Sequence, residues 1–161
     1  MVVHASDIGD AIEIESFSWK RSPSPDDHGT FNDMVIYMGL CGSDQLGMIF
    51  DDNYIPGTRI LVLSGNPYTT QTVGVNEWFE FTFDTPFWYN GQDNLLIEIQ
   101  WSSASGSLYS WNWNGGSDRC VYGLYGQPSG LVLNSNVPNL LLNGTLSLEN
   151  STFARIKAAF N

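Results

Sequence analysis

Hydrophobic and polar residues alternate with a period of two in three separate stretches of this chain. In residues 78–84 the phenylalanines share one parity and the polar residues share the other. Successive side chains of a β-strand point to opposite faces, so the pattern predicts a strand that is buried on one face. Residues 94–101 and 107–114 show the same alternation. From the first two stretches we predict these core residues: Phe79, Phe81, Phe83, Leu95, Ile97 and Ile99.

Five further stretches have the composition of strands, at residues 12–19, 33–39, 59–63, 139–142 and 153–158. In the first of them the hydrophobic parity switches between Ile14 and Phe17, which predicts a β-bulge near Ser16. Glycine, asparagine and proline separate the stretches in turn sequences, and no window has the pattern of a capped amphipathic helix. We therefore predict an all-β fold with two antiparallel sheets, packed as a sandwich of the jelly-roll type.

The chain of 161 residues has the length of one domain, and we expect a single domain over residues 1–161. Its net charge is −11, from six Lys and Arg against seventeen Asp and Glu. So few cations argue against nucleic acid and anionic membranes as partners. No hydrophobic run is long enough for membrane insertion as a helix. The low charged fraction of 14%, with abundant Ser, Thr, Asn and Gly, is typical of a secreted or cell-surface β-protein.

Residues 83–99 read FDTPFWYNGQDNLLIEI. This stretch resembles the FDTPFxYNGxDNLLIEI motif of a bacterial extracellular β-sandwich accessory domain, which occurs in secreted and surface proteins that often carry a C-terminal sorting signal. Residues 35–39 resemble its xIYMGxT strand, and residues 118–120 and 137–140 resemble its NRC and MPN segments. The resemblance covers about residues 31–142 and leaves 145–161 as an extra C-terminal hairpin. It implies an accessory module without catalytic residues.

Two cysteines, Cys41 and Cys120, are candidates for one disulfide in an oxidising compartment. The alternative is that both are small buried thiols. Leu40 and Cys41 stand where the family resemblance has a His-Thr pair, so only Cys120 belongs to the family pattern.

Nothing in the sequence has the arrangement of a nucleophile and its base, so we predict that the domain is not an enzyme. The two histidines, His4 and His28, lie in polar segments outside any motif. A carboxylate-based glycoside hydrolase or lyase is the remaining catalytic alternative. Glu98 is the most unusual acid because it lies inside an apolar strand. We expect it to be paired with a cation such as Arg119, or exposed on the solvent face.

No cofactor is expected, and calcium is the one candidate metal. Residues 26–27, 51–53 and 90–94 are rich in the carboxylate and amide oxygens that calcium uses. None of these segments has the spacing of an EF-hand loop, and the same composition is ordinary in turns.

The aromatic residues Tyr109, Trp111 and Trp113 suggest a ligand-binding surface, because sugar rings stack on flat aromatic faces. The alternative is that these rings fill the core. Trp88 and Tyr89, beside a turn, are a second candidate pair for ligand binding. From these residues we predict a non-catalytic extracellular module that attaches to a polysaccharide or to a surface protein.

A structural role is the alternative from a different class. The C-terminal hairpin would place Leu146 and Leu148 in one strand, and Ala154, Ile156 and Ala158 in the other. Together with the N-terminal strand it could add to the sheet edge of a neighbour, which would make the protein a self-associating subunit of a surface fibre or layer.

Overall fold

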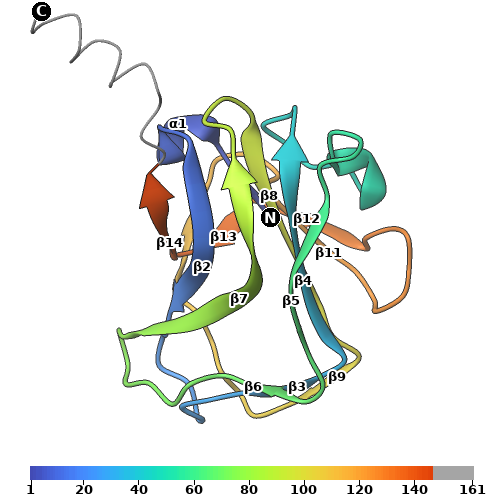
Figure 1. Ribbon diagram of the computed structural model, residues 1–161. Helices are drawn as coiled ribbons and strands as arrows, with labels where there is room; N and C mark the ends of the chain where they lie inside the picture. Colours follow the sequence, from blue (N-terminus) through green and yellow to red (C-terminus); the bar gives the residue numbers. More distant parts are fainter. Residues whose placement is uncertain (147–161) are drawn as a thin grey trace, which may run out of the picture.

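The computed structural model describes residues 1–146 of the chain, and nearly all of its regular elements are strands (Figure 1). In chain order the elements are β1 (Val2–Val3), α1 (Ala5–Ile8), β2 (Ile12–Lys20), β3 (Thr30–Asn32), β4 (Met34–Cys41), η1 (Asp51–Asn53), β5 (Ile60–Gly65), β6 (Tyr68–Thr69), β7 (Trp78–Tyr89), β8 (Asn94–Gln100), β9 (Ser103–Ser105), β10 (Asn112–Asn114), β11 (Cys120–Tyr122), β12 (Val132–Asn134), β13 (Asn136–Pro138) and β14 (Leu140–Leu146).

The strands form two larger and three smaller sheets, in which all the described pairs are antiparallel. The four-stranded sheet has the order β1-β8-β4-β5, and a three-stranded sheet has the order β14-β2-β7. The smaller sheets are β6-β3-β9, β10-β13 and β11-β12. The prediction of an all-β fold with antiparallel sheets is therefore confirmed. No helix in residues 1–146 has the length and hydrophobicity needed to cross a membrane.

One hydrophobic core lies between the four-stranded and the three-stranded sheet. Phe79 and Phe81 of β7 and Leu95 and Ile97 of β8 are all buried in it, as their alternation predicts. Phe83 and Ile99, the other two predicted core residues, pack against the same cluster but are only half-buried. The core also takes side chains from the neighbouring strands, among them Ile14, Phe17, Met34, Ile36, Met38 and Val62.

The predicted bulge near Ser16 is confirmed, because the pairing of β2 with β7 shifts register between Ile14 and Ser16. On the β7 side, Phe87 pairs with Ile14 while Thr82 pairs with Ser16, so four residues of β7 lie opposite one residue of β2 and β7 carries three extra residues. The Asp84 carboxylate in this excursion accepts a 3.1 Å hydrogen bond from the Ser64 amide of β5. The strand predicted at residues 78–84 therefore continues to Tyr89 and links the two larger sheets.

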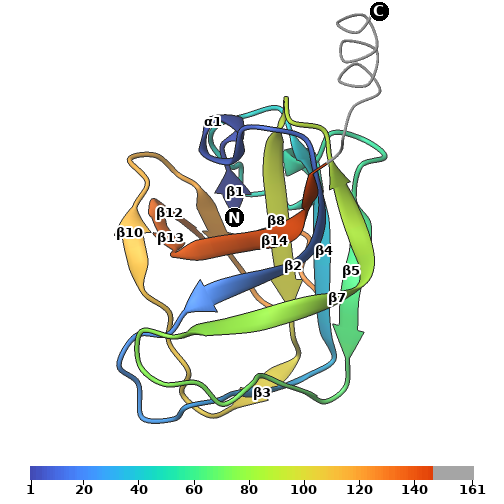
Figure 2. The same cartoon turned by 60° about the vertical axis from the view of Figure 1, so that its left-hand side comes forward.

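The outer faces of the two larger sheets differ. The outer face of β14-β2-β7 is open in Figure 2. The outer face of the four-stranded sheet is covered, because Leu96 of β8 is buried in a second cluster with Leu46, Tyr54 and Val121. These partners come from the segment between β4 and β5 and from the β11-β12 hairpin. Polar residues of β8 that point away from the main core thus face protein rather than open solvent.

Two sequence predictions need correction or fall outside the described residues. In residues 107–114 only Asn112–Asn114 form a strand. The Trp111 amide donates to the Lys20 carbonyl, and the Asn139 amide donates to the Trp111 carbonyl, so this residue links two segments instead of continuing one ladder. In the predicted hairpin at 145–161, residues 145–146 are the end of β14, and residues 147–161 lie outside the described part of the chain.

Candidate functional site

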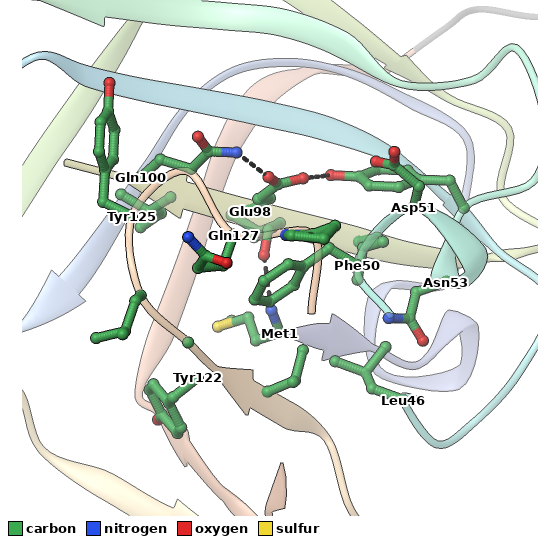
Figure 3. A pocket seen from close by; sticks show the side chains of 18 of the residues that line it. Met1, Leu46, Phe50, Asp51, Asn53, Glu98, Gln100, Tyr122, Tyr125 and Gln127 are labelled. Atoms are coloured by element: carbon green, nitrogen blue, oxygen red, sulfur yellow. Dashed lines mark hydrogen bonds between the residues drawn. The ribbon is translucent and has the colours of Figure 1, made fainter. Parts of the chain in front are cut away.

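A cleft of about 480 Å³ lies on the outer face of the four-stranded sheet (Figure 3). Its floor comes from residues 96–100 at the end of β8. One wall comes from residues 50–54 and the other from residues 121–128 of the β11-β12 hairpin. A cleft of this size is typical of a site for a small molecule or for a few units of a polymer.

Glu98 lies in the floor of the cleft and is held by three donors. Its side chain is only 13% exposed, which would be costly for an unpaired carboxylate. The Tyr54 hydroxyl donates to Oε2 at 2.6 Å, and Arg59 Nη2 donates to Oε1 at 2.8 Å. Gln100, two residues along β8, donates its amide to the same Oε1. The sequence expectation of an ion pair for Glu98 is thus confirmed, but its partner is Arg59.

Arg119, the cation suggested as the partner of Glu98, is used elsewhere. Its guanidinium donates to the Asp7 carboxylate at 2.9 Å and to the Val2 carbonyl at 3.3 Å. Its Cζ atom also lies 5.1 Å from the centre of the Trp113 ring. The pairing of Glu98 with Arg119 was therefore wrong, because the buried Arg119 guanidinium is bound to Asp7 and to the first strand.

Arg59 is fixed by strand register as well as by charge. β4 pairs with β8 so that Tyr37 lies opposite Glu98, and β5, which begins directly after Arg59, lies on the other side of β4. The guanidinium carbon of Arg59 is 4.1 Å from the centre of the Tyr37 ring and 5.4 Å from that of Tyr54. Arg59 Nη1 also donates to the Asp51 carboxylate at 3.2 Å. Its two terminal nitrogens are thus both bound to carboxylates.

The two charged or hydroxyl partners of Glu98, Arg59 and Tyr54, both have raised pKa values. Burial raises the pKa of the Tyr54 phenol far above its ordinary value of 10.0, and the charge of Glu98 raises it further. Desolvation would lower the pKa of Arg59, but the charges of Glu98, Tyr54 and Asp51 outweigh it and raise that pKa. Tyr54 therefore remains a hydrogen-bond donor, and Arg59 remains charged, through the physiological pH range.

The walls of the cleft are aromatic and exposed. Tyr122 and Tyr125 on the hairpin and Trp101 just after β8 each have two-fifths or more of their surface open to solvent. Burial, followed by the neighbouring Cys120 thiol, raises the pKa of Tyr122 to about 12. Phe50 contributes the facing side. A polar floor between aromatic walls can bind a ligand that presents both apolar faces and hydroxyl or amino groups.

Backbone contacts hold the hairpin wall in place. The Gly130 amide donates to the Met48 carbonyl at 2.7 Å, and the Phe50 amide donates to the Pro128 carbonyl at 3.1 Å. At Gly123 an added Cβ would come within 2.8 Å of the Phe50 ring, so glycine allows the close approach. The two walls are therefore parts of one connected layer over the sheet.

The aromatic residues predicted to bind a ligand do not line this cleft. Tyr109, Trp111, Trp113 and Trp88 are all exposed, which excludes the alternative that the first three fill the core. Trp111 Nε1 donates to the Asn76 side chain at 2.8 Å, whereas Trp113 lies against Arg119, so the two rings have different neighbours.

The prediction that Tyr89 binds a ligand at the surface is wrong, because its side chain is 0% exposed and belongs to the main core. β7 continues past Pro86 with the same parity, so Tyr89 follows Phe87 into the interior.

Tyr122, Tyr125 and Trp101 were not among the binding residues predicted from the sequence. A usable signal exists for the two tyrosines, since residues 122–126 read Tyr-Gly-Leu-Tyr-Gly. Aromatic residues between glycines in a turn cannot all be buried by strand alternation, and such loops often carry binding residues.

The predicted disulfide is not formed in the structure, because Cys41 and Cys120 are both free and buried. The Cys41 thiol donates instead to the Ser43 carbonyl at 3.3 Å. Cys41 is a small apolar member of the second cluster and Cys120 is also buried, so both match the alternative of small buried thiols.

Within residues 1–146, no three His, Cys, Asp or Glu side chains are grouped so that they could hold a metal ion. The oxygens of the segments considered for calcium have other partners. The Asp51 carboxylate accepts from Arg59, and Asp27 Oδ1 lies 2.7 Å from His28 Nδ1. The Asn90 side-chain amide donates to the Asp93 carboxylate at 2.7 Å. Calcium binding stays a prediction from composition.

Both carboxylate oxygens of Glu98 already accept hydrogen bonds, from Tyr54, Arg59 and Gln100. Neither His4 nor His28 lines the cleft. Comparisons with protein-family models, with curated proteins and with solved structures give no significant match to this chain, so its function has to be inferred from this geometry.

Proposed function

We propose that this protein is a non-catalytic, secreted or cell-surface module that binds a polysaccharide in the cleft above Glu98. The observation that carries the proposal is the combination of the exposed aromatic walls with a floor of fixed polar groups. Pyranose rings have apolar C–H faces that stack on tyrosine and tryptophan, and rims of hydroxyls that bind carboxylate and amide side chains. We also infer that the two larger sheets form a jelly-roll type of sandwich, a rigid support for such a cleft.

Binding without hydrolysis is supported by the position of the two carboxylates. Glycoside hydrolysis needs one carboxyl group as a proton donor and a second one on the opposite side of the scissile bond. Here Asp51 and Glu98 bind the two terminal nitrogens of the same guanidinium, so one cation holds both carboxylates. We therefore keep the carboxylate-based hydrolase or lyase as the least favoured alternative.

The test is a set of variants screened on a glycan array. We expect Tyr122→Ala and Tyr125→Ala to lose most of the binding, because both rings are exposed walls of the cleft. Tyr109→Ala is the matched control, since its ring is equally exposed but lies outside the cleft. Trp88→Ala and Trp111→Ala test the surface predicted from the sequence. Loss of binding in these two variants, with full binding in the cleft variants, would contradict the cleft as the site.

Self-assembly is the second candidate function, and the edge of the three-stranded sheet favours it. β14 is the outermost strand of the order β14-β2-β7, and Leu141 and Leu146 on it are exposed. Such an edge can receive a strand from a neighbouring molecule. Size-exclusion chromatography and negative-stain images would show ordered polymers if this function is correct. Monomers at high concentration, together with glycan binding, would exclude it.

A further inference from the structure

The edge of the four-stranded sheet beside β8 is only partly paired. β1, the edge strand, is two residues long and pairs with the first half of β8. One step further, the Met1 nitrogen donates to the Ile97 carbonyl at 2.6 Å, and the Ile97 amide donates to the Met1 carbonyl at 2.9 Å. β8 continues to Gln100, and within residues 1–146 no strand pairs with 98–100 on this side. These residues belong to the floor of the cleft.

The main chain of Ile99 has an unused donor and an unused acceptor at this edge. Alternate residues of an antiparallel strand direct their N–H and C=O groups to the same side. The groups of Ile97 point to Met1, and β8 pairs with β4 without a register shift. The groups of Ile99 therefore also point away from β4, past the end of β1. In the described part of the chain, no group beyond the sheet ladders bonds to them.

β11 presents a second edge to the same gap. On the side of β1 away from β8, the Val2 amide donates to the Arg119 carbonyl at 2.8 Å. The Tyr122 carbonyl is used on the β12 side, where it accepts from the Leu131 amide at 2.7 Å. By the same alternation, the main-chain groups of Val121 point away from β12, as the Arg119 carbonyl does. β1 thus lies between β8 and the start of β11, and Val121 lines the cleft where that gap continues.

The gap has the width of one strand, because β1 bonds to both of its sides. A segment that continued the line of β1 would pair with Ile99 on one side and with Val121 on the other, antiparallel to β8. Its side chains would alternate between two faces. On one face they would lie beside Ile99 against the main core, where Met1 already packs. On the other face they would extend into the cleft, between its aromatic walls.

We propose that residues 153–158 of a second copy of this chain enter this gap as an added strand. Small or aliphatic side chains on one parity suit the face beside the core. Longer side chains on the other parity suit the cleft, because aromatic walls can pack their apolar stems while the charged ends reach solvent. The first set is Ala154, Ile156 and Ala158, and the second is Phe153, Arg155 and Lys157.

Charge favours association between copies through this segment. Two of the six cations of the chain are Arg155 and Lys157, and residues 150–161 contain no acid. The remainder, residues 1–149, has four cations and all seventeen acids. The positive segment of one copy is therefore attracted to the negative body of another, which raises the rate of encounter.

The position of β14 favours a second copy over the same copy as the source of the strand. Leu146, the last residue of β14, pairs with Ile12, which follows α1, and the start of β8 also lies beside α1, since Asn94 Oδ1 accepts from the Ala5 amide. The gap opens at the opposite end of β8. The seven residues from 146 to 153 span at most about 25 Å, and β8 alone is about 23 Å long. The segment of the same copy would use nearly all of its reach and would then have to reverse direction.

This inference extends self-assembly, the second candidate function, and does not depend on glycan binding. An added strand would occupy the floor of the cleft, so strand and glycan would exclude each other there. A glycan that binds in the cleft should therefore weaken the association of the chain with itself.

The first test is sedimentation of the full chain over a range of concentrations. We expect association, and we expect Ile156→Pro to weaken it about tenfold or more, because proline removes a main-chain donor from the added strand. Ser151→Pro is the matched control, since it lies in the same segment but before the strand, and it should leave association unchanged. Neither substitution changes a residue within 1–146.

The second test is amide hydrogen exchange, followed residue by residue by NMR. The amides of Ile99 and Val121 should exchange about fivefold or more slowly once the chain associates, because both would gain partners. The Ile97 amide is the control, since it is already bonded to the Met1 carbonyl. Association without slower exchange at Ile99 and Val121 would place the contact elsewhere, for example at the β14 edge, and overturn the proposal.

The remaining outcomes separate this inference from the proposed functions. Association that persists in Ile156→Pro would overturn this inference alone and leave self-assembly through another edge. A chain that stays monomeric at all concentrations would overturn both, including the case in which Ile99 and Val121 are protected by the segment of the same copy. Glycan binding by such a monomer would leave the polysaccharide-binding module intact.

Discussion

Tyr54 donates a 2.6 Å hydrogen bond to Glu98 across 44 residues of sequence, and this contact joins the covering layer to the four-stranded sheet. Tyr54 follows η1 at the base of the covering layer, while Glu98 lies near the end of β8. The Tyr54 side chain and the Glu98 carboxylate are both largely buried, so water does not compete for this hydrogen bond. The hydrogen bonds in the floor of the cleft therefore contribute to the stability of the fold. Substitutions of these residues should change the free energy of unfolding.

Replacing Arg59 with Met should destabilise the protein by about 2–3 kcal/mol, because Glu98 would lose its counter-ion in a largely buried position. The expected loss is below that of a fully buried pair, since Arg59 is itself partly exposed and water can replace some of the interaction. Urea denaturation at neutral pH measures the change in the free energy of unfolding.

The control for this variant is the double change of Arg59→Met with Glu98→Gln. Removing both charges leaves no unpaired ion, so the double variant should be more stable than the sum of the two single effects predicts, by about 1 kcal/mol or more. Strictly additive effects would show that the ion pair does not determine the loss.

Gly39→Ala should disturb the cleft from beneath. An added Cβ at Gly39 would lie 2.5 Å from the Tyr54 ring and 3.3 Å from the Arg59 backbone. The ring would have to move away from Glu98, and we expect a destabilisation of about 1–3 kcal/mol, as for overpacked cores. Gly42→Ala is the matched control, because its added Cβ meets no atom within 4 Å. Equal stability of the two variants, by thermal or urea unfolding, would contradict the packing of Tyr54 on Gly39.

The parts of the fold that could be predicted are those set by local alternation. The phenylalanines of β7 and the aliphatic residues of β8 point inward, because only the apolar face of an alternating strand can pack against the core. The parity switch around Ser16 marks the bulge for the same reason. Glu98 was recognisable as unusual because a charge among apolar neighbours needs a partner.

The parts that could not be predicted depend on contacts between distant segments. Arg59 reaches Glu98 only because β4 pairs with both β5 and β8, and no local pattern contains those registers. The segment 107–114 alternates like a strand, but its backbone bonds to two different segments, and its aromatic rings remain outside. The cleft itself depends on the β11-β12 hairpin lying over β8, which only the tertiary structure shows.

The two cysteines should both react with Ellman's reagent in denaturant without reductant. The structure has free thiols at both positions, and their burial protects them from reaction in the folded state. We therefore expect two thiols per chain after unfolding, and slow or absent reaction before it. A value of zero after unfolding, restored to two by a reductant, would instead show that Cys41 and Cys120 form the disulfide considered from the sequence.

Alkaline pH should destabilise the protein through tyrosines that are buried or partly buried in the fold. Burial is the largest cause of the raised pKa at Tyr54, Tyr68, Tyr89 and Tyr122, and nearby acidic groups raise it further. Each phenol therefore holds its proton more tightly in the folded chain than in the unfolded chain, whose value is 10.0. Stability is fully present below pH 10 and is lost as the pH rises above it, because the unfolded chain releases protons that the folded chain retains.

Tyr54→Phe separates this effect from the general titration of the chain. Within the window above pH 10, each retained proton lowers the free energy of unfolding by about 1.4 kcal/mol per pH unit. The variant lacks the hydrogen bond to Glu98, so it should be less stable than the original by about 1–3 kcal/mol at neutral pH. Its stability should then fall less steeply between pH 10 and pH 12. Urea unfolding across this range, with Tyr109→Phe as an exposed control, measures the two slopes. Parallel slopes for Tyr54→Phe and the original protein would show that Tyr54 is not the buried, proton-retaining donor to Glu98 that the structure describes.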